Sequence, residues 1–206
     1  MLYYWWWYIT LGLISYLIGG INFAVILSRI KNIDIKNNGS RNPGTLNMYR
    51  CCGNFLGSFT FVLDALKGAI CAFIGLYTLG QFGVFYGGLF CAIGHIFTLY
   101  YKFKGGKGIA VTFGMFFVAN YIMATAMLLI LILYLLIFKH GAVGTLMSIT
   151  ILTIAECVLV YPEWKSILCM LSIIILIYIK HITNIKNIKN SHEKIFSLRK
   201  GKIKRF

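Results

Sequence analysis

The first group of residues suited to chemistry surrounds Lys107, in the stretch FKGGKG at residues 103–108. Glycine lets backbone N–H groups approach an anion closely, and the start of a following helix adds a favourable dipole. The Lys107 ammonium adds a compact positive charge. The nucleotide-binding pattern G-x-x-x-x-G-K-[ST] does not fit, because Tyr101 and Gly108 occupy two of its defining positions. The stretch therefore predicts a phosphate-binding loop of another kind. The glycines of this loop are Gly105, Gly106 and Gly108.

A second group lies in the polar stretch NNGSRNPGTLNMYR, residues 37–50. Its glycines, proline and asparagines are typical of a structured, turn-rich loop. Arg41 and Arg50 offer planar guanidinium groups that suit phosphate oxygens. The same composition is also typical of a solvated connector that carries cytoplasmic charges, and these residues alone do not decide between the two. The neutral candidates for substrate contact in this stretch are Ser40, Asn42, Gly44 and Asn47.

A third group, DALKG, contains two ionisable residues inside an apolar segment. Asp64 and Lys67 are three residues apart, so they share one face of a helix and can form a pair. Ionisable residues at membrane depth mark either a functional site or a structural pair. We expect this pair mainly to support the architecture.

Two histidines complete the set of polar candidates. His95 precedes the glycine loop in a predicted helix, where it is either a buried hydrogen-bonding residue or a substrate ligand. His181 and Asn184 are three residues apart in KHITNIKNIKNSHE, residues 180–193, so they face the same way where the last helix leaves the membrane. They form either part of a site or a polar cap on that helix.

The segments that must position these groups are apolar. The chain has 206 residues, of which 59% are hydrophobic and 12% are charged, about half the charged fraction of a soluble domain. Several apolar runs approach the roughly 20 residues that span a bilayer. We therefore predict an all-α polytopic integral membrane protein, with residues 1–206 as one membrane-embedded domain. The apolar segments are residues 3–28, 54–79, 82–100, 108–119, 121–138, 145–161 and 164–180.

The distribution of charge decides how many helices to expect. Residues 108–138 could form one overlong helix or two short helices that are broken near Asn120. With two helices, 18 of the 20 Lys and Arg residues fall on one side, and only Lys67 and Lys165 lie elsewhere. Because basic residues favour the cytoplasmic side, we predict seven transmembrane helices with the N-terminus outside and the C-terminus in the cytoplasm.

The net charge of +15 is explained by these cytoplasmic loops, so we expect no nucleic-acid partner. None of the six cysteines forms a C-x-x-C pair, and Cys91 with His95 lacks a second pair of ligands. We therefore expect neither a disulfide nor a metal. The basic tail, residues 194–206, is expected to be flexible and attracted to anionic lipid.

In combination, these motifs resemble those of the bacterial membrane glycerol-3-phosphate acyltransferases that use acyl phosphate, the PlsY family. The family pattern G-S-G-N-x-G-A-T-N-x-x-R stands here as GSRNPGTLNMYR, and D-A-x-K-G stands as DALKG. The pattern G-H-x-F-x-x-x-x-x-F-K-G-G-K-G stands as GHIFTLYYKFKGGKG, and R-H-x-x-N-I-x-R-L-x-x-G-x-E stands as KHITNIKNIKNSHE. The four motifs occur in order over nearly the whole chain.

The resemblance implies an enzyme of the plasma membrane whose active site faces the cytoplasm. It would transfer a fatty acyl group from acyl phosphate to the 1-hydroxyl of glycerol 3-phosphate, the first acylation of phospholipid synthesis, without a cofactor or metal. The products would be lysophosphatidic acid and inorganic phosphate. The enzyme that forms acyl phosphate is a possible protein partner. Two other classes fit the residues less well, namely a transporter for a small phosphorylated anion and a membrane scaffold without activity.

Residue by residue, the resemblance assigns catalysis to five positions and support to a further one. The departures from the family pattern lie at Arg41, Thr45, Leu46, Asn187 and Ser191, and Gly20 replaces a serine near the end of the first segment. Thr145 corresponds to a family serine and keeps its hydroxyl for substrate binding. Glu193, the last residue of the fourth motif, is expected to support the site. The residues assigned to catalysis are Ser40, Arg50, Lys107, His181 and Asn184.

Overall fold

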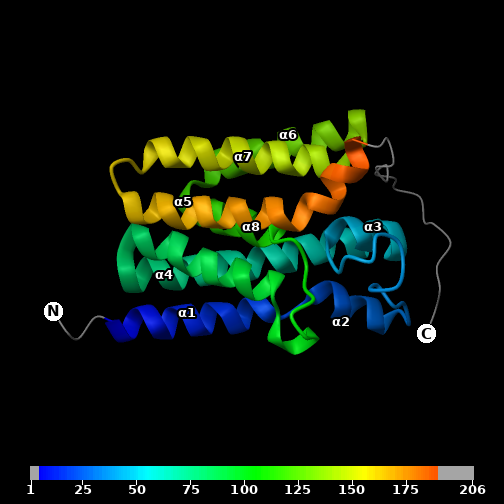
Figure 1. Ribbon diagram of the computed structural model, residues 1–206, viewed down its shortest axis with the longest axis horizontal. Coiled ribbons are helices and arrows are strands. Elements are labelled where there is room, and N and C mark those ends of the chain that lie inside the picture. Colours follow the sequence, from blue (N-terminus) through cyan, green and yellow to red (C-terminus); the bar gives the residue numbers. More distant parts are fainter. Residues whose placement is uncertain (1–4, 190–206) are drawn as a thin grey trace.

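The computed structural model describes residues 5–189, and in that part of the chain every regular element is a helix. Most of the helices lie side by side, with their axes along the long direction of the molecule (Figure 1). The elements are α1 (Trp5–Gly20), α2 (Phe23–Ile30), α3 (Thr45–Cys52), α4 (Asn54–Ile96), the 3-10 helix η1 (Leu99–Tyr101), α5 (Ile109–Ala119), α6 (Tyr121–Phe138), α7 (Gly141–Leu159) and α8 (Trp164–Lys189).

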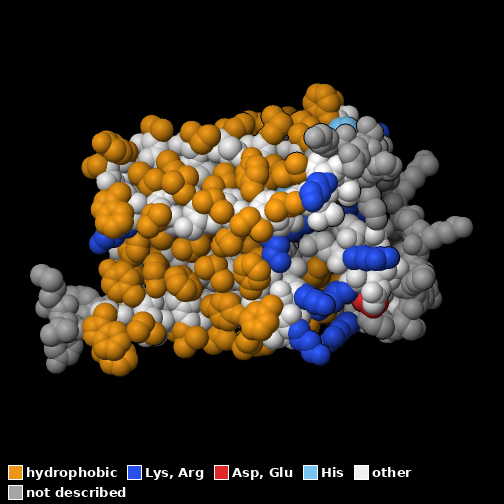
Figure 2. Space-filling model, viewed as in Figure 1, with side chains coloured by type: hydrophobic (Ala, Val, Ile, Leu, Met, Phe, Trp, Pro, Cys, Tyr) orange, Lys and Arg blue, Asp and Glu red, His pale blue; other side chains and the backbone are white. Residues whose placement is uncertain are grey.

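Five stretches of these helices are long and apolar enough to cross a membrane, and α5 is a shorter apolar helix. Apolar side chains cover most of the visible face, whereas most blue Lys and Arg side chains gather at the end that holds α2 and α3 (Figure 2). The five stretches are Trp5–Ile30, Asn54–Tyr101, Tyr121–Phe138, Gly141–Leu159 and Trp164–Asn187. The expected all-helical class with apolar spans is therefore confirmed in the described residues.

The longest of these stretches is folded back on itself. Helical geometry breaks at Gly80, whose φ is +66° and ψ is −153°, values that a residue without a Cβ adopts easily. The two arms of α4 then pack so closely that a Cβ on Gly75 would lie 1.9 Å from the Gly83 carbonyl oxygen. The same holds for Gly87 and the Cys71 carbonyl oxygen, at 2.4 Å. Gly75 in the first arm lies against Gly83, and the earlier residue Cys71 lies against the later residue Gly87, so the two arms run antiparallel.

The break predicted near Asn120 is confirmed. Asn120 has extended backbone between α5 and α6, and its side-chain oxygen accepts a hydrogen bond from the Met123 amide at 3.1 Å. Such a cap satisfies one of the orphan amides at the start of a helix. The two helices have 11 residues in α5 and 18 in α6, in agreement with the predicted segments 108–119 and 121–138.

The first apolar run, expected as one segment over residues 3–28, is broken as well. Asn22 separates α1 from α2, and its side-chain oxygen accepts a hydrogen bond from the Val25 amide at 3.0 Å. The carbonyls that the break exposes are not left in an apolar environment, because the Lys67 ammonium donates to Gly19 at 2.9 Å and also to Ile21. A buried lysine of α4 thus closes the end of α1.

The buried apolar residues form two separate cores. The larger core lies among α4, α5, α6, α7 and α8. The smaller core anchors residues 31–44, the loop between α2 and α3, onto those two helices. Its buried members are Ala24, Val25, Ile33, Ile35, Met48 and Cys51.

Candidate active site

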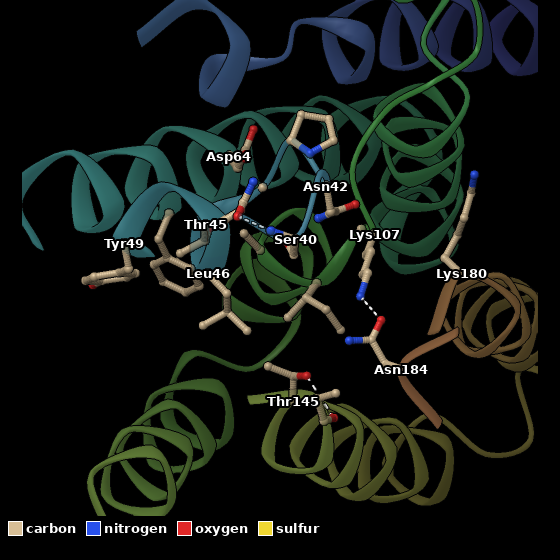
Figure 3. Close-up of a pocket in the computed structure, with 18 of the residues that line it drawn as sticks. Ser40, Asn42, Thr45, Leu46, Tyr49, Asp64, Lys107, Thr145, Lys180 and Asn184 are labelled. Atoms are coloured by element: carbon tan, nitrogen blue, oxygen red, sulfur yellow. Dashed lines mark hydrogen bonds between the residues drawn. The ribbon is translucent and has the colours of Figure 1, made fainter. Parts of the chain in front are cut away.

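A cavity of about 1110 Å³ brings the four polar motifs together (Figure 3). Gly106 and Lys67 do not line it, and Glu193 lies outside the described residues, as does the 194–206 tail. The predicted residues that line the cavity are Ser40, Asn42, Gly44, Asn47, Arg50, Asp64, His95, Gly105, Lys107, Gly108, Thr145, His181 and Asn184.

The loop of the first motif is fixed from within by Asn47. This buried side chain donates to the carbonyls of Ile35 at 3.1 Å and Asn38 at 3.0 Å, and its oxygen accepts from the Ser40 amide at 2.7 Å. Asn47 was expected to contact substrate, yet its amide group is engaged in holding the loop. Its geometry is that of a positioning residue that keeps Ser40 at the cavity wall.

Gly105 and Gly106 of the FKGGKG loop pack closely against the backbone at the end of α4, and their amides bond to protein carbonyls. The Gly105 amide donates to the Ile96 carbonyl at 3.2 Å, and the Gly106 amide donates to the His95 carbonyl at 3.0 Å. A Cβ on Gly105 would lie 1.9 Å from the His95 carbonyl oxygen. This differs from the expectation that both amides face phosphate, and it shows why both positions need glycine.

The amides available for an anion lie one step further along the chain. Gly108 has a φ of +87° and turns the loop into α5. Helix geometry leaves the first amides of α5 without partners in the helix, and Gly108, Ile109 and Ala110 line the cavity. A helix start carries a partial positive charge and binds phosphate or carboxylate oxygens.

Lys107 joins the third motif to the fourth. Its ammonium donates to the side-chain oxygen of Asn184 on α8, and Figure 3 shows this contact between Ser40 and Asn42 on one side and Thr145 on the other. One turn before Asn184, the Nδ1 atom of buried His181 lies 2.8 Å from the Ile177 carbonyl oxygen. A donor at Nδ1 leaves Nε2 of neutral His181 as an acceptor.

The predicted pair of Asp64 and Lys67 is confirmed. The Lys67 ammonium lies 2.9 Å from Asp64 Oδ1 and 2.9 Å from His95 Nδ1, and all three side chains are buried. Because an ammonium can only donate, His95 accepts through Nδ1. Of the two roles open to His95 in the sequence, the structure shows the buried hydrogen-bonding one, although the residue also reaches the cavity wall.

Comparison with known proteins decides the family. A family model described as "Glycerol-3-phosphate acyltransferase" matches residues 9–191. The chain belongs to the glycerol-3-phosphate acyltransferase family.

Curated relatives and solved structures agree with this membership. The acyltransferase of Finegoldia magna is 37% identical over 141 residues, which cover 68% of this chain and 71% of that protein. Glycerol-3-phosphate acyltransferase 1 of Bacillus cereus is 35% identical, and the match covers 79% of this chain and 90% of that protein.

Two crystal structures of PlsY, an integral membrane glycerol 3-phosphate acyltransferase, superpose on this chain. The glycerol 3-phosphate form has a TM-score of 0.86 and 28% identity, and the match covers 92% of this chain and 96% of the PlsY chain. The lysophosphatidic acid form has a TM-score of 0.83. This acyltransferase is thus an integral membrane protein with a helical fold like that of PlsY.

The acyltransferase cavity also has walls that the sequence motifs did not reveal. One wall is apolar and includes Leu128, Leu131, Ile132 and Leu135 of α6. Their spacing defines one face of a helix, but every neighbour in α6 is apolar too, so the pattern cannot be seen in the sequence. The other wall carries Arg41, which the sequence offered as a phosphate ligand, and three cations that it did not single out, namely Lys36, Lys104 and Lys180.

These cations line the polar end of the acyltransferase cavity, which we call its mouth. The Lys36 ammonium lies 4.4 Å from the centre of the Tyr101 ring, and the Arg29 guanidinium lies 5.9 Å from it. Partial burial, followed by the charge of Arg29, lowers the pKa of Lys36, while Asp34 acts in the opposite direction. The mouth is therefore positively charged and suited to attract anions.

Proposed function

We propose that this acyltransferase moves a fatty acyl group from acyl phosphate to the 1-hydroxyl of sn-glycerol 3-phosphate. The products are lysophosphatidic acid and inorganic phosphate. The observation that carries the proposal is the division of one cavity into a cationic end with Arg50 and Lys107 and an apolar wall on α6. Such a cavity accepts a phosphorylated head and a hydrocarbon chain together. The substrate class is supported by the two PlsY structures, which are a glycerol 3-phosphate form and a lysophosphatidic acid form.

In the membrane, we propose seven spans within one embedded unit, with the N-terminus outside and the C-terminus in the cytoplasm. The two arms of α4 count as separate spans, and α5 is the short one. The arrangement accounts for the concentration of Lys and Arg side chains at one end of the molecule (Figure 2). The cavity mouth then opens on the cytoplasmic side of the plasma membrane, where soluble glycerol 3-phosphate is available.

Each polar residue has a role in this reaction. Arg50, Lys107 and the first amides of α5 neutralise phosphate oxygens and the charge that develops at the acyl carbonyl. His181 through Nε2 and Asn184 orient glycerol 3-phosphate, and Ser40 and Thr145 supply hydroxyls at the cavity wall. Bringing two reactants together in a reactive geometry can lower a barrier by up to about 7–11 kcal/mol.

The chemistry is a direct transfer. The substrate hydroxyl oxygen forms the new ester bond to the acyl carbon, and the bond from that carbon to the phosphate oxygen breaks. The phosphate leaves with the electron pair and accepts the hydroxyl proton. A stable acyl group on Ser40 after incubation with acyl phosphate alone would contradict direct transfer and support a covalent intermediate.

The function is tested with purified protein in lipid vesicles, radiolabelled glycerol 3-phosphate and palmitoyl phosphate. We expect labelled lysophosphatidic acid from the unaltered protein and from Lys102→Ala, whose side chain is exposed and outside the cavity. We expect almost none from Lys107→Ala. Product with palmitoyl-CoA but not with palmitoyl phosphate would overturn the donor. Uptake of the label into empty vesicles, without any product, would support a transporter instead.

A further inference from the structure

The backbone of Arg41 adopts a conformation that side chains of its size rarely occupy. Its φ is +61°, in the left-handed region, which is uncommon for residues other than glycine and occurs at functional sites. Hydrogen bonds hold the turn, because the Arg41 amide donates to the Asn38 carbonyl at 3.0 Å, the Ser40 amide donates to Asn47, and beyond Arg41 the Gly44 amide donates to the Asn42 carbonyl at 3.0 Å. The loop therefore presents residue 41 in one fixed position.

The side chain of Arg41 has no protein counter-ion among residues 5–189. It is exposed, it lines the cavity, and neither a hydrogen bond nor an ion pair engages its guanidinium within that part of the chain. Asp34, the acidic residue of the same loop, accepts from the Lys36 amide at 3.1 Å and from the Asn37 side chain. Asp64 is paired with Lys67. An uncompensated guanidinium that a defined turn presents at the wall of a cavity is suited to an anionic ligand.

The position of Arg41 indicates which anion it meets. Its neighbours Ser40 and Asn42 lie on the polar side of the cavity (Figure 3), whereas the apolar wall lies on α6. A residue exposed on the polar side is open to the soluble substrate, whereas the donor is drawn toward the apolar wall by its acyl chain. We propose that Arg41 binds the phosphate of incoming glycerol 3-phosphate and so determines the affinity for this substrate. The inference rests on the proposed function.

The test is Arg41→Gly, which removes the guanidinium and places in the turn a residue that accepts a φ of +61°. Glycine is also what the family pattern has at this position. We expect the KM for glycerol 3-phosphate to rise by about five- to tenfold, as for the loss of a partly exposed charged hydrogen bond. We expect kcat, the KM for palmitoyl phosphate and the thermal midpoint to stay unchanged. Arg41→Lys should recover part of the affinity.

Lys102→Gly is the matched control. Lys102 is also a basic, exposed residue with positive φ, at +54°, but it does not line the cavity. Its substitution should leave both KM values unchanged. If Arg41→Gly affects folding, Arg41→Gln removes the charge, keeps a long side chain and should raise the same KM.

Calorimetric titration with glycerol 3-phosphate alone, without acyl donor, separates this inference from the proposed function. A weaker affinity of Arg41→Gly for glycerol 3-phosphate supports the role of Arg41. If the unaltered protein also forms no product with palmitoyl phosphate, the donor assignment fails, but the role of Arg41 in binding glycerol 3-phosphate stands. An unchanged affinity and KM for glycerol 3-phosphate would overturn the inference. A rise in the KM for palmitoyl phosphate alone would also overturn it, since it would place Arg41 on the donor.

Discussion

Lys67 and Lys107 are two ammonium groups of one membrane protein in different surroundings. The Lys67 ammonium is buried, contacts Asp64, His95 and the carbonyl of Gly19, and does not reach the cavity. The Lys107 ammonium lines the cavity and contacts the side chain of Asn184. The comparison teaches that an ionisable residue among apolar helices does not by itself mark an active site. What distinguishes the two is whether the ammonium is enclosed by its protein partners or lies at a cavity wall.

The most damaging change is expected at the enclosed lysine. Lys67→Met leaves the Asp64 carboxylate buried without its cation and removes the donor that satisfies the end of α1. Breaking such a pair costs about 3–5 kcal/mol. We expect the thermal midpoint of the purified protein to fall by about 10 °C or more, measured by the fluorescence of detergent-solubilised protein.

The double variant Asp64→Asn with Lys67→Met serves as its control, because it removes both charges together. Part of the lost stability should return. An unchanged midpoint in the single variant would contradict the structural role of Lys67.

At the cavity lysine, activity and stability should separate. Lys107→Ala removes a cation that neutralises phosphate, and the loss of one such group lowers turnover by about 10²–10³-fold. The thermal midpoint should stay close to that of the unaltered protein. Steady-state rates of lysophosphatidic acid formation measure the first quantity, with Lys102→Ala as the exposed control. Should Lys107→Ala keep full activity, the cavity would not be the site of phosphate binding.

A further variant makes the cavity lysine resemble the enclosed one. Asn184→Asp places a carboxylate against the Lys107 ammonium, as Asp64 is placed against Lys67. The new charge competes with substrate phosphate and repels it, so kcat/KM should fall by about 10–100-fold. Asn184→Ala, which removes the contact without adding a charge, should lose less. Equal losses in the two variants would mean that Asn184 acts through its hydrogen bond alone.

The smallest effect is expected far from both lysines. Asn120 caps α6 and does not line the cavity. Asn120→Ala should cost about 1 kcal/mol of stability, seen as a fall of a few degrees in the thermal midpoint, with kcat/KM unchanged. A large loss of activity would show that the break between α5 and α6 shapes the site.

Features that involve charge or local hydrogen bonding could be predicted from the sequence. The pairing of Asp64 with Lys67 follows from their spacing, and the break at Asn120 follows from the side on which basic loops must lie. The convergence of the four motifs on one cavity follows from their resemblance to a known family and not from spacing.

Features that depend on packing between distant segments could not be predicted. Asn22 interrupts an apolar run, but the residue that closes the break, Lys67, lies on another helix. Gly105 has the sequence signature of a phosphate loop, yet its amide pairs with α4, which only the fold reveals. The apolar wall on α6 is hidden because each face of that helix is equally hydrophobic.

The small core beneath the loop between α2 and α3 has a consequence for motion. Ile35 and Met48 are fully buried there, yet they belong to a cluster separate from that of the helix bundle. A segment with its own core can unfold locally while the rest of the protein stays intact. The Ser40 amide, which Asn47 holds, then exchanges its hydrogen with solvent through this local opening and not through global unfolding. The loop that admits substrate can thus have its own timescale, set by a handful of side chains outside the bundle.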